Sequence, residues 1–339
     1  MPDTLHWGIL STARINRRII PPLRRASRSE PVAVAGRDPD RTRDFAARWG
    51  IGEVFPSYRE LLACPGIDAV YIPLPNSLHC EWVVRTARAG KHVLCEKPLS
   101  LTAAEAEKMA SAARENGVVL LEAMAYRMHP QFLRLQSLIG EGMIGRIGLI
   151  RAWFRFTLPA GENFRWSKEM GGGVLRDVGC YPVNFCRAVA GSSPETVYCR
   201  QLIGPTGVDI LSSGQLTFPG GLIAQIDCAF SLPFGVGAEV IGEKGVLRLP
   251  NPWQPDIDGK SGGLIHIAPD DTETSIPVPA ADPYLCEIEA MESAVLDGVP
   301  PLYTVEESRE NAAAIAALYR SARSGRPVNV TTRSISRGI

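Results

Sequence analysis

The sequence has no arrangement of cysteine and histidine that would hold a metal ion. Its eight cysteines and five histidines are scattered, and no two cysteines are separated by only two residues. The first residues lack the basic and then apolar layout of a signal peptide, and no apolar run reaches the ~20 residues that a membrane-spanning helix needs. These absences predict reduced, mostly buried thiols, no metal, no membrane partner and a cytoplasmic location.

Net charge is missing as well. Lysine and arginine number 36 together, and so do aspartate and glutamate. A neutral chain does not attract nucleic acid over a long range, so we expect no nucleic-acid partner. The chain does have length, because 339 residues are many for one hydrophobic core and suit two domains.

The glycines of a dinucleotide-binding fingerprint are absent from the first strand-to-helix turn. The three places of G-x-G-x-x-G hold Ser11, Ala13 and Asn16. Serine and alanine are still small enough for backbone amides to approach a pyrophosphate, and the hydroxyls of Ser11 and Thr12 can donate to it. The turn alone therefore fits either a nucleotide site or any strand-to-helix turn of an α/β domain.

Short apolar segments alternate with helical patterns through the first 125 residues. The predicted strands cover residues 6–11, 31–36, 68–74, 91–95 and 118–124. This alternation predicts an α/β fold with a parallel sheet covered on both faces. The helix after the first strand is expected to kink or stop at Pro21-Pro22, because proline removes a helical hydrogen bond.

The pattern changes after a predicted helix near residues 129–139. Long strand-like segments follow, interrupted by one helix near 175–189, and two more helices are predicted at 284–298 and 304–325. This order favours an open, antiparallel or mixed sheet with one face packed on helices. The tail 331–339 is expected to be poorly ordered.

Two arginines follow the second predicted strand. Arg37 comes directly after Gly36, and Arg41 lies one helical turn further on. Arginine suits a 2′-phosphate and can stack on adenine, whereas a site specific for NAD usually has a carboxylate here. Asp38 is interpreted as the cap of the next helix. The alternative is a solvated charged turn, but the arginines favour NADP, with NAD possible.

The strand at 91–95 ends in Glu96, Lys97 and Pro98. A carboxylate and an ammonium beside a hydrophobic interior are costly unless something uses them. These letters alone fit either a salt-bridged surface turn or a functional site.

Three segments together decide between these alternatives: "AVYIPLPNSLH", "AGKHVLCEKPLS" and "GGGVLRDVGCYPVN". They resemble the glucose-fructose oxidoreductase, inositol dehydrogenase and rhizopine-catabolism (Gfo/Idh/MocA) family, and the likeness covers nearly the whole chain. The resemblance implies a Rossmann domain with a doubly wound parallel sheet over residues 1–125. It also implies a substrate-binding and oligomerising α/β domain with an open, predominantly antiparallel sheet over 126–330.

The family resemblance further implies NAD(P)-linked chemistry on a small, sugar-like substrate, in a homodimer or higher oligomer joined through the second sheet. In such proteins the lysine of E-K-P lies beside the nicotinamide and touches the reacting oxygen. That residue is Lys97 here. Glu96 would orient or charge-balance it, and the peptide bond to Pro98 would be cis.

One departure shapes the expected mechanism. Many relatives place a histidine four residues after the aspartate of the third segment, but Asp177 is followed by Tyr181. This resembles the branch with glucose-fructose oxidoreductase, dimeric dihydrodiol dehydrogenase and aldose (xylose) dehydrogenases. A phenol has a pKa near ~10, so Lys97 is expected to lower it and let Tyr181 accept the substrate proton. An aromatic core residue is the alternative for Tyr181.

The resemblance also suggests further contacts. The additional cofactor candidates are Arg14, Ile15, Pro75, Asn76, His79, Arg165 and Trp166, and the substrate candidates are Glu122, Tyr126, Arg127 and Asp177. His79 fits a helix cap equally well, and Arg165 and Trp166 also fit an ordinary loop anchor. The cluster Arg14, Arg17, Arg18, Arg24 and Arg25 is interpreted as a solvated helix face, from which Arg14 could reach a phosphate.

The predicted function is that of an NADP-preferring dehydrogenase, with oxidation of an aldose at C1 favoured. Reduction of a keto-sugar or dicarbonyl, and oxidation of a cyclic dihydrodiol, remain alternatives on the same site. A non-catalytic dinucleotide sensor is an alternative of another class. The presence of both Lys97 and Tyr181 speaks against a sensor, which needs neither.

Overall fold

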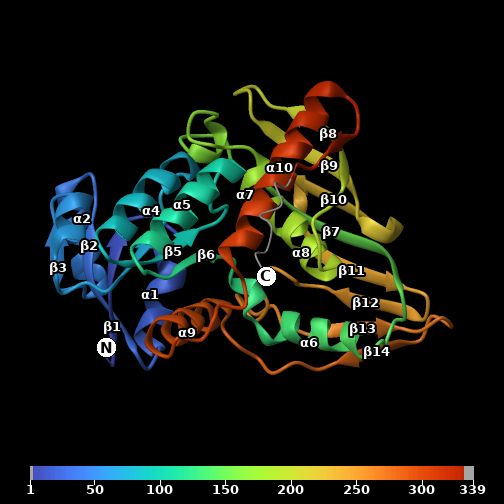
Figure 1. Ribbon diagram of the computed structural model, residues 1–339, viewed down its shortest axis with the longest axis horizontal. Helices are drawn as coiled ribbons and strands as arrows, with labels where there is room; N and C mark the ends of the chain where they lie inside the picture. The colour runs from blue at the N-terminus through green and yellow to red at the C-terminus, as the bar shows by residue number, and fades with distance from the viewer. Residues whose placement is uncertain (1–2, 332–339) are drawn as a thin grey trace.

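Two β-sheets lie side by side in the computed structural model, which describes residues 3–331 (Figure 1). One sheet has six strands and is built from the first part of the chain, and the other has nine. This is the α/β architecture that the sequence predicts. Of the tail expected to be poorly ordered, residues 332–339 lie outside the described residues.

The six-stranded sheet is parallel and has the order β3-β2-β1-β4-β5-β6. Its strands are β1 Leu5–Leu10, β2 Ser29–Ala35, β3 Glu53–Phe55, β4 Ala69–Ile72, β5 His92–Glu96 and β6 Leu120–Ala123. Strand order reverses between β1 and β4, and ligands of open α/β sheets bind outside the carboxyl ends of the strands at such a point. The short edge strand β3 was not predicted.

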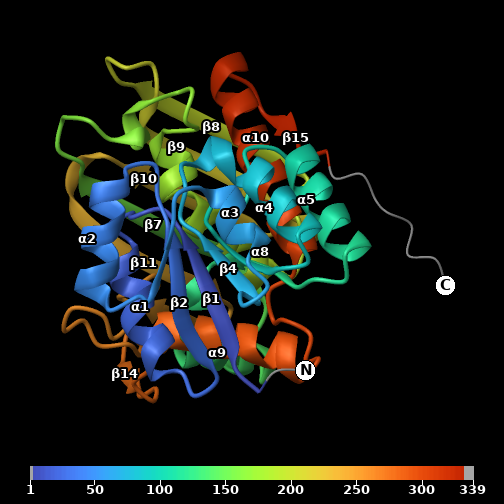
Figure 2. The same ribbon diagram turned by 90° about the vertical axis from the view of Figure 1, so that its left-hand side faces the viewer.

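Helices cover both faces of this sheet (Figure 2). They are α1 Asn16–Arg25, α2 Pro39–Trp49, α3 Tyr58–Ala63, α4 His79–Arg88 and α5 Ala103–Glu115. Successive residues of a strand pack into the hydrophobic cores on opposite faces of the sheet. Tyr71 packs in the core on the α1 side, and its neighbours Val70 and Ile72 pack in the core on the α4 side. All three are fully buried, which explains the continuously apolar strands.

The sequence predicts that this helix kinks or stops at Pro21-Pro22; α1 does not stop there and continues to Arg25. The two rings remove backbone donors from the helix interior. The fully buried side chains of Ile19, Ile20 and Leu23 pack in the core on both sides of the prolines. Tertiary packing therefore outweighs the local helix-breaking preference.

The nine-stranded sheet has the order β14-β13-β12-β11-β7-β10-β9-β8-β15 and is antiparallel except where β7 pairs with β10. Its strands are β7 Ile147–Thr157, β8 Thr196–Ile203, β9 Asp209–Thr217, β10 Ile223–Ala229, β11 Ser231–Gly242, β12 Gly245–Leu249, β13 Leu264–Ile267, β14 Glu273–Ile276 and β15 Val328–Asn329. The remaining elements are α6 Pro130–Gly140, α7 Val174–Asp177, α8 Cys180–Ala190, α9 Pro283–Leu296, α10 Val305–Ser324, η1 Asn76–Leu78, η2 Ala125–Arg127, η3 Phe164–Trp166 and η4 Pro219–Gly221.

The single helix predicted near 175–189 is in fact two helices, α7 and α8, which meet at Val178 and Gly179. The chain turns tightly there: a Cβ on Gly179 would lie 2.7 Å from the Cα of Leu175. Asp177 thus ends one helix, and Tyr181 lies in the first turn of the next.

The last two helices return to the first sheet. Helix α10 packs against both α5 and β8, and α9 packs against α1 (Figures 1 and 2). Four of the five arginines of the basic cluster, Arg14, Arg17, Arg24 and Arg25, are exposed, as the sequence suggested, and Arg18 is half-buried. Arg18 pairs with Asp258 at 2.5 Å, and Arg25 pairs with Asp282, so both arginines tie α1 to later parts of the chain.

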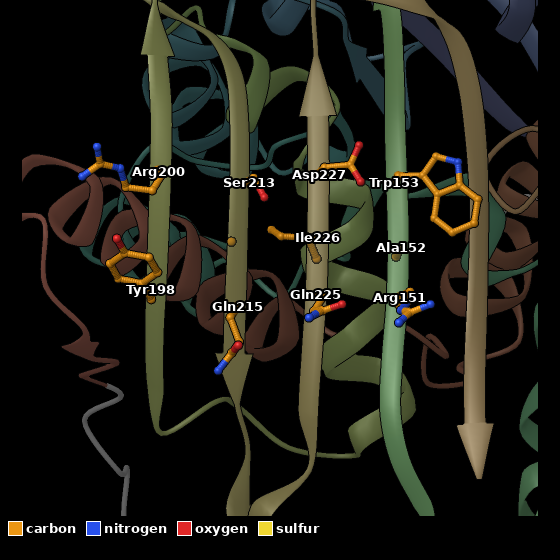
Figure 3. A pocket seen from close by; sticks show the side chains of 11 residues that line it. Arg151, Ala152, Trp153, Tyr198, Arg200, Ser213, Gln215, Gln225, Ile226 and Asp227 are labelled. Atoms are coloured by element: carbon orange, nitrogen blue, oxygen red, sulfur yellow. The ribbon is translucent and has the colours of Figure 1, made fainter.

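Within residues 3–331, no helix covers the outer face of the nine-stranded sheet, which holds a shallow groove of about 430 Å³ (Figure 3). Its walls include Arg151, Trp153, Arg200 and Asp227, from strands β7, β8 and β10. Trp153 lies flat against β11, because a Cβ on Gly237 would come within 2.1 Å of its ring. No helix of the described residues is long and apolar enough to cross a membrane.

Candidate active site

The end of β5 is fixed by the half-buried carboxylate of Glu96. Glu96 accepts the hydroxyl of Tyr71 at 2.6 Å and the backbone N–H of its neighbour Lys97 at 3.3 Å. Burial raises the pKa of Glu96, and the charge of Lys97 partly opposes the rise. The Lys97–Pro98 peptide bond is cis, as expected. Glu96 therefore orients the backbone from which the Lys97 side chain leaves.

Lys97 and Arg165 share one carboxylate, that of Asp177. The ammonium of Lys97 donates to the backbone carbonyl of Asp177 at 2.5 Å and lies 3.4 Å from its Oδ1, while Arg165 Nε donates to Oδ2 at 2.7 Å. Burial alone would raise the pKa of Asp177, but the two cations outweigh it and hold the pKa below its ordinary value. Asp177 is therefore ionised, and both of its oxygens are engaged.

Tyr181 stands beside this ion cluster. The Lys97 ammonium lies over its ring, 5.0 Å from the centroid, and the lysine's hydrogen bonds go to Asp177. Burial raises the pKa of the Tyr181 phenol well above its ordinary value, and the nearby Tyr284 adds to the rise. The shift is opposite to the one expected from sequence, in which Lys97 lowers the pKa.

Three aromatic rings surround Tyr181, and two of them, Phe154 and Trp253, were not singled out from the sequence. The ring centroids of Tyr126, Phe154 and Trp253 lie 6.1, 5.8 and 5.9 Å from its own. Trp253 is held by a hydrogen bond of 2.9 Å from its indole N–H to the carbonyl of Trp153. These residues come from η2, β7 and the segment after β12, so no local pattern connects them to Tyr181.

In the turn after β1, a serine adopts a backbone conformation that normally requires glycine. Ser11 has φ +91°, a region that favours glycine, and it occupies the place of the first fingerprint glycine. Its carbonyl accepts from Asn16 Nδ2 at 2.9 Å, and the Oδ1 of Asn16 is buried without a partner. The backbone N–H groups of residues 16–18 already donate to the carbonyls of residues 13–15. Within residues 3–331, the N–H groups of residues 12–15 make no such bond, so they are the ones available for an anion.

This turn therefore fits a pyrophosphate. Thr12, Ala13 and Ile15 are partly buried along it, and Arg14 is exposed. Its small side chains leave the backbone approachable, as the sequence predicted.

Arg37 and Arg41 lie beyond the end of β2 and are both exposed. Within residues 3–331, neither side chain makes a hydrogen bond or ion pair of its own. Asp38 caps α2 by accepting from the Arg41 backbone N–H at 3.0 Å, as predicted. The carboxylate is therefore used by the helix, and two uncommitted guanidinium groups remain. These residues fit a 2′-phosphate.

Side chains in the segment after β4 form hydrogen bonds that connect this segment to neighbouring loops. Asn76 donates to the carbonyl of Gly171 at 2.9 Å, and Pro75 is half-buried. His79 is fully buried, with its ring nitrogens 2.8 Å from the carbonyl oxygen of Leu74 and 3.0 Å from that of Pro98. Asn76 thus joins this loop to the glycine-rich segment, and His79 joins it to the turn after Lys97, so His79 can act on a cofactor only through these loops.

Three of the expected substrate contacts, Glu122, Tyr126 and Arg127, are almost fully buried. Glu122 accepts the backbone N–H of Leu99 at 2.9 Å and the hydroxyl of Tyr303 at 2.7 Å. The hydroxyl of Tyr126 donates to Asn184 at 2.6 Å, and Arg127 donates to Glu307 at 2.9 Å. Since most of their polar atoms bond to protein, with Arg127 Nε the exception within the described residues, their geometry supports positioning rather than the direct contact expected. Sequence spacing does not separate these roles.

Trp166 lies with Arg165 in η3 and is anchored by a hydrogen bond of 3.1 Å to the carbonyl of Pro159. Its ring meets Phe230 edge-on at 5.5 Å. Arg165 and Trp166 are both only partly buried, so this short helix borders the Lys97 site.

Two family profiles match the chain. That of an oxidoreductase family with an NAD-binding Rossmann fold matches residues 5–124, and that of the GFO/IDH/MocA C-terminal domain matches residues 132–248. Together they cover more than half of the 339 residues.

Curated relatives and solved structures match over most of their length. The chain is 36% identical over 326 residues to a D-xylose 1-dehydrogenase (NADP(+)) of Haloferax volcanii, covering 96% of this chain and 99% of that one. It is 34% identical to a trans-1,2-dihydrobenzene-1,2-diol dehydrogenase of Xenopus laevis, covering 75% and 79%. A 3-ketoreductase from Actinomadura kijaniata, solved with NADP and TDP-benzene, superposes with a TM-score of 0.89 at 31% identity, covering 94% and 98%.

The parallel sheet, the open second sheet and the cluster at the end of β5 define a nicotinamide-dinucleotide-dependent oxidoreductase. The chain belongs to the Gfo/Idh/MocA family. The resemblance and the fold class predicted from sequence are thereby confirmed, and so is an NAD(P) cofactor. The domain boundary after residue 125 stays a prediction.

The glycine-rich segment before α7 generates one testable prediction. A Cβ on Gly172 would lie 2.4 Å from the backbone oxygen of Arg165, and Gly172 does not have a positive φ, so the conflict is purely steric. Gly172→Ala should destabilise the protein by about 1–3 kcal/mol, measured by denaturant unfolding. Gly148→Ala, on β7 with no atom within 4 Å, is the control and should have little effect. Equal behaviour of the two variants would contradict this account.

Proposed function

We propose that the protein is an NADP-preferring dehydrogenase that acts on a sugar-like hydroxyl, with oxidation of an aldose at C1 favoured. The observation that carries the proposal is the contact between the Lys97 ammonium and the Tyr181 ring at the carboxyl end of the parallel sheet. The likeness to a D-xylose 1-dehydrogenase (NADP(+)) supports this choice.

In the proposed mechanism, Lys97 and Tyr181 hold the reacting oxygen between them. When bound, NADP would supply the ring carbon that accepts the hydride. Tyr181 takes the hydroxyl proton while the C–H bond of the same carbon breaks. The Lys97 ammonium has three N–H groups, so it can donate one to that oxygen while it stays bound to Asp177. Asp177 stays charged because Arg165 is also bound to it. The contacts that fix Glu96 and Asp177 bring Lys97 and Tyr181 close to the reacting oxygen and orient them toward it.

Reduction of a keto-sugar is the second candidate, and one observation favours it. The phenol of Tyr181 is protonated at neutral pH, as an ordinary tyrosine is, and burial raises its pKa further, so the proton that reduction of a carbonyl requires is present on Tyr181. The structural likeness to a 3-ketoreductase agrees with this direction. Dihydrodiol oxidation has support from the rings of Phe154 and Trp253 next to Tyr181, and from the dihydrodiol dehydrogenase relative.

A substrate panel separates these candidates. Aldoses, keto-sugars, dicarbonyls and dihydrodiols are assayed with NADP and NAD in both directions, by the absorbance of the reduced nicotinamide. A substrate-dependent change also distinguishes an enzyme from the alternative of a dinucleotide sensor, which would bind cofactor without turnover.

The role of Tyr181 is tested by Tyr181→Phe, which removes one hydroxyl and keeps the ring. Loss of acid–base assistance should lower kcat by ~10²–10⁴-fold, with cofactor affinity unchanged. In the oxidation direction, wild-type kcat should rise with pH as the phenol ionises, at alkaline pH because the pKa is raised. In the reduction direction it should fall with pH. In Tyr181→Phe, kcat should lose both of these pH dependences.

Lys97→Met is the companion variant, because it keeps an apolar chain of similar length and removes the cation. Turnover should be lost, while cofactor binding stays measurable by fluorescence titration. An unchanged pH profile in Tyr181→Phe, or near-normal kcat in Lys97→Met, would refute the assigned roles.

NADP preference is tested by Arg37→Ala. A charge-assisted bond of roughly 1.5–3 kcal/mol to the 2′-phosphate corresponds to a rise in KM for NADP of about 10- to 200-fold. The KM for NAD should change little, because NAD lacks that phosphate. Arg43→Ala is the matched control, since Arg43 is exposed on α2 and pairs with Asp40. Equal losses for both cofactors would assign Arg37 to a shared group or to structure.

We also propose a homodimer joined through the outer face of the nine-stranded sheet. A two-fold axis over the groove would let Arg151 and Arg200 of one copy meet Asp227 of the other, and would cover Trp153. Light scattering at micromolar concentration should give a dimer, and Gln225→Arg, in the middle of this face, should give a monomer. Gln136→Arg on α6, also at an exposed glutamine, should leave the dimer intact. A wild-type monomer would contradict the proposal.

A further inference from the structure

A buried aspartate outside the candidate active site holds the segment that carries Asp177. Asp209 lies on β9 with 3% of its surface exposed. Its Oδ2 accepts the backbone N–H of Leu175 at 2.8 Å and the hydroxyl of Ser212 at 3.0 Å. Its Oδ1 accepts the hydroxyl of Tyr319 at 2.7 Å. The proposed mechanism uses none of these groups.

The bond to Leu175 fixes the start of α7. This helix is a single turn, from Val174 to Asp177, so the position of its first residues sets the position of its last. The carboxylate also lies close to the preceding backbone: a Cβ on Gly173 would be 2.1 Å from Asp209 Oδ1. Asp209 thus determines where Asp177 lies relative to the end of β5.

The position of Asp177 in turn determines the position of the Lys97 ammonium. Its backbone carbonyl, at the end of α7, accepts from the Lys97 ammonium at 2.5 Å. The glycine-rich segment is linked to the same site, because Gly173 N–H donates to the carbonyl of Arg165 at 3.0 Å. A shift of α7 would therefore move the partners of Lys97 and the beginning of α8, which carries Tyr181.

The other side of Asp209 leads to α10. Tyr319, on α10, donates to Asp209 and has the guanidinium of Arg176 over its ring at 4.9 Å. Since α10 also packs on α5 of the first sheet, the contact connects α7 to a helix that joins both sheets.

We propose that Asp209 is a positioning residue for the active site, which aligns Asp177 and through it Lys97 by holding the start of α7 against β9 and Tyr319. The proposal rests on the roles of Lys97 and Tyr181 proposed above. A purely structural carboxylate would lower stability when removed but leave the rate per folded molecule unchanged. A positioning residue changes kcat.

The test compares Asp209→Ala, Asp209→Asn and Tyr319→Phe. Asp209→Ala should lower kcat by about 10–100-fold, since a displacement of ~1 Å in a catalytic group has effects of that size. Cofactor affinity, measured by fluorescence titration, should change by less than about threefold, because the pyrophosphate turn is not touched. Asp209→Asn should restore most of kcat, because its amide oxygen can still accept from Leu175 and its NH₂ can donate to Tyr319.

Tyr319→Phe provides a variant that folds if Asp209→Ala does not, and its kcat should fall between those of the wild type and Asp209→Ala. The control is Asp68→Ala. Asp68 also accepts a backbone N–H, from His6 at 2.9 Å, but lies at the opposite end of the strands. The Asp68→Ala variant should be less stable than the wild type but keep its kcat. Wild-type kcat in both Asp209→Ala and Tyr319→Phe would overturn the proposal.

A crystal structure of Asp209→Ala separates this inference from the proposed function. Displacement of Asp177 from Lys97 together with a lower kcat supports both. An unmoved α7 refutes the positioning role, whatever happens to the rate. A displaced Asp177 with unchanged kcat refutes instead the proposed dependence of catalysis on Lys97.

Discussion

The carboxylate of Asp177, held between Lys97 and Arg165, is the contact on which the arrangement of the site depends. It joins the end of β5 in one sheet to η3 and α7 beside the other. Removing the charges of Asp177 and Lys97 from water costs solvation free energy that their mutual attraction offsets only with good geometry. That geometry is provided by Glu96 on one side and by Asp209 on the other, each bonded to a backbone N–H. The ionic cluster is thus stable only where both sheets are correctly placed.

Most of the fold could be predicted because its strands are apolar and long enough to have a clear period. The failures have physical reasons. Strands β3, β14 and β15 are short and partly exposed, so they carry little hydrophobic pattern. The prolines in α1 are tolerated because buried isoleucines hold the helix, which local preference does not reveal. The break between α7 and α8 follows from one glycine that packs against the preceding turn.

Only the site residues that belong to short sequence motifs could be predicted. Lys97, Asp177 and Tyr181 stand in motifs, and the structure brings them together. Asp209 and Trp253 act through contacts between segments far apart in the chain, and neither has a neighbouring signal. The direction of the pKa shift of Tyr181 also depends on burial and on where a lysine side chain turns, which spacing does not determine.

The return of α10 to the first sheet has a consequence for how the chain is made. This helix, residues Val305–Ser324, packs on α5, and its Glu307 accepts a hydrogen bond from Arg127 of η2. During synthesis, the amino-terminal residues leave the ribosome long before α10 exists. At about 5–20 residues per second, roughly 200 residues separate α5 from α10, which is a delay of tens of seconds. Throughout that interval, the face of α5 that α10 will cover stays exposed to water and to chaperones.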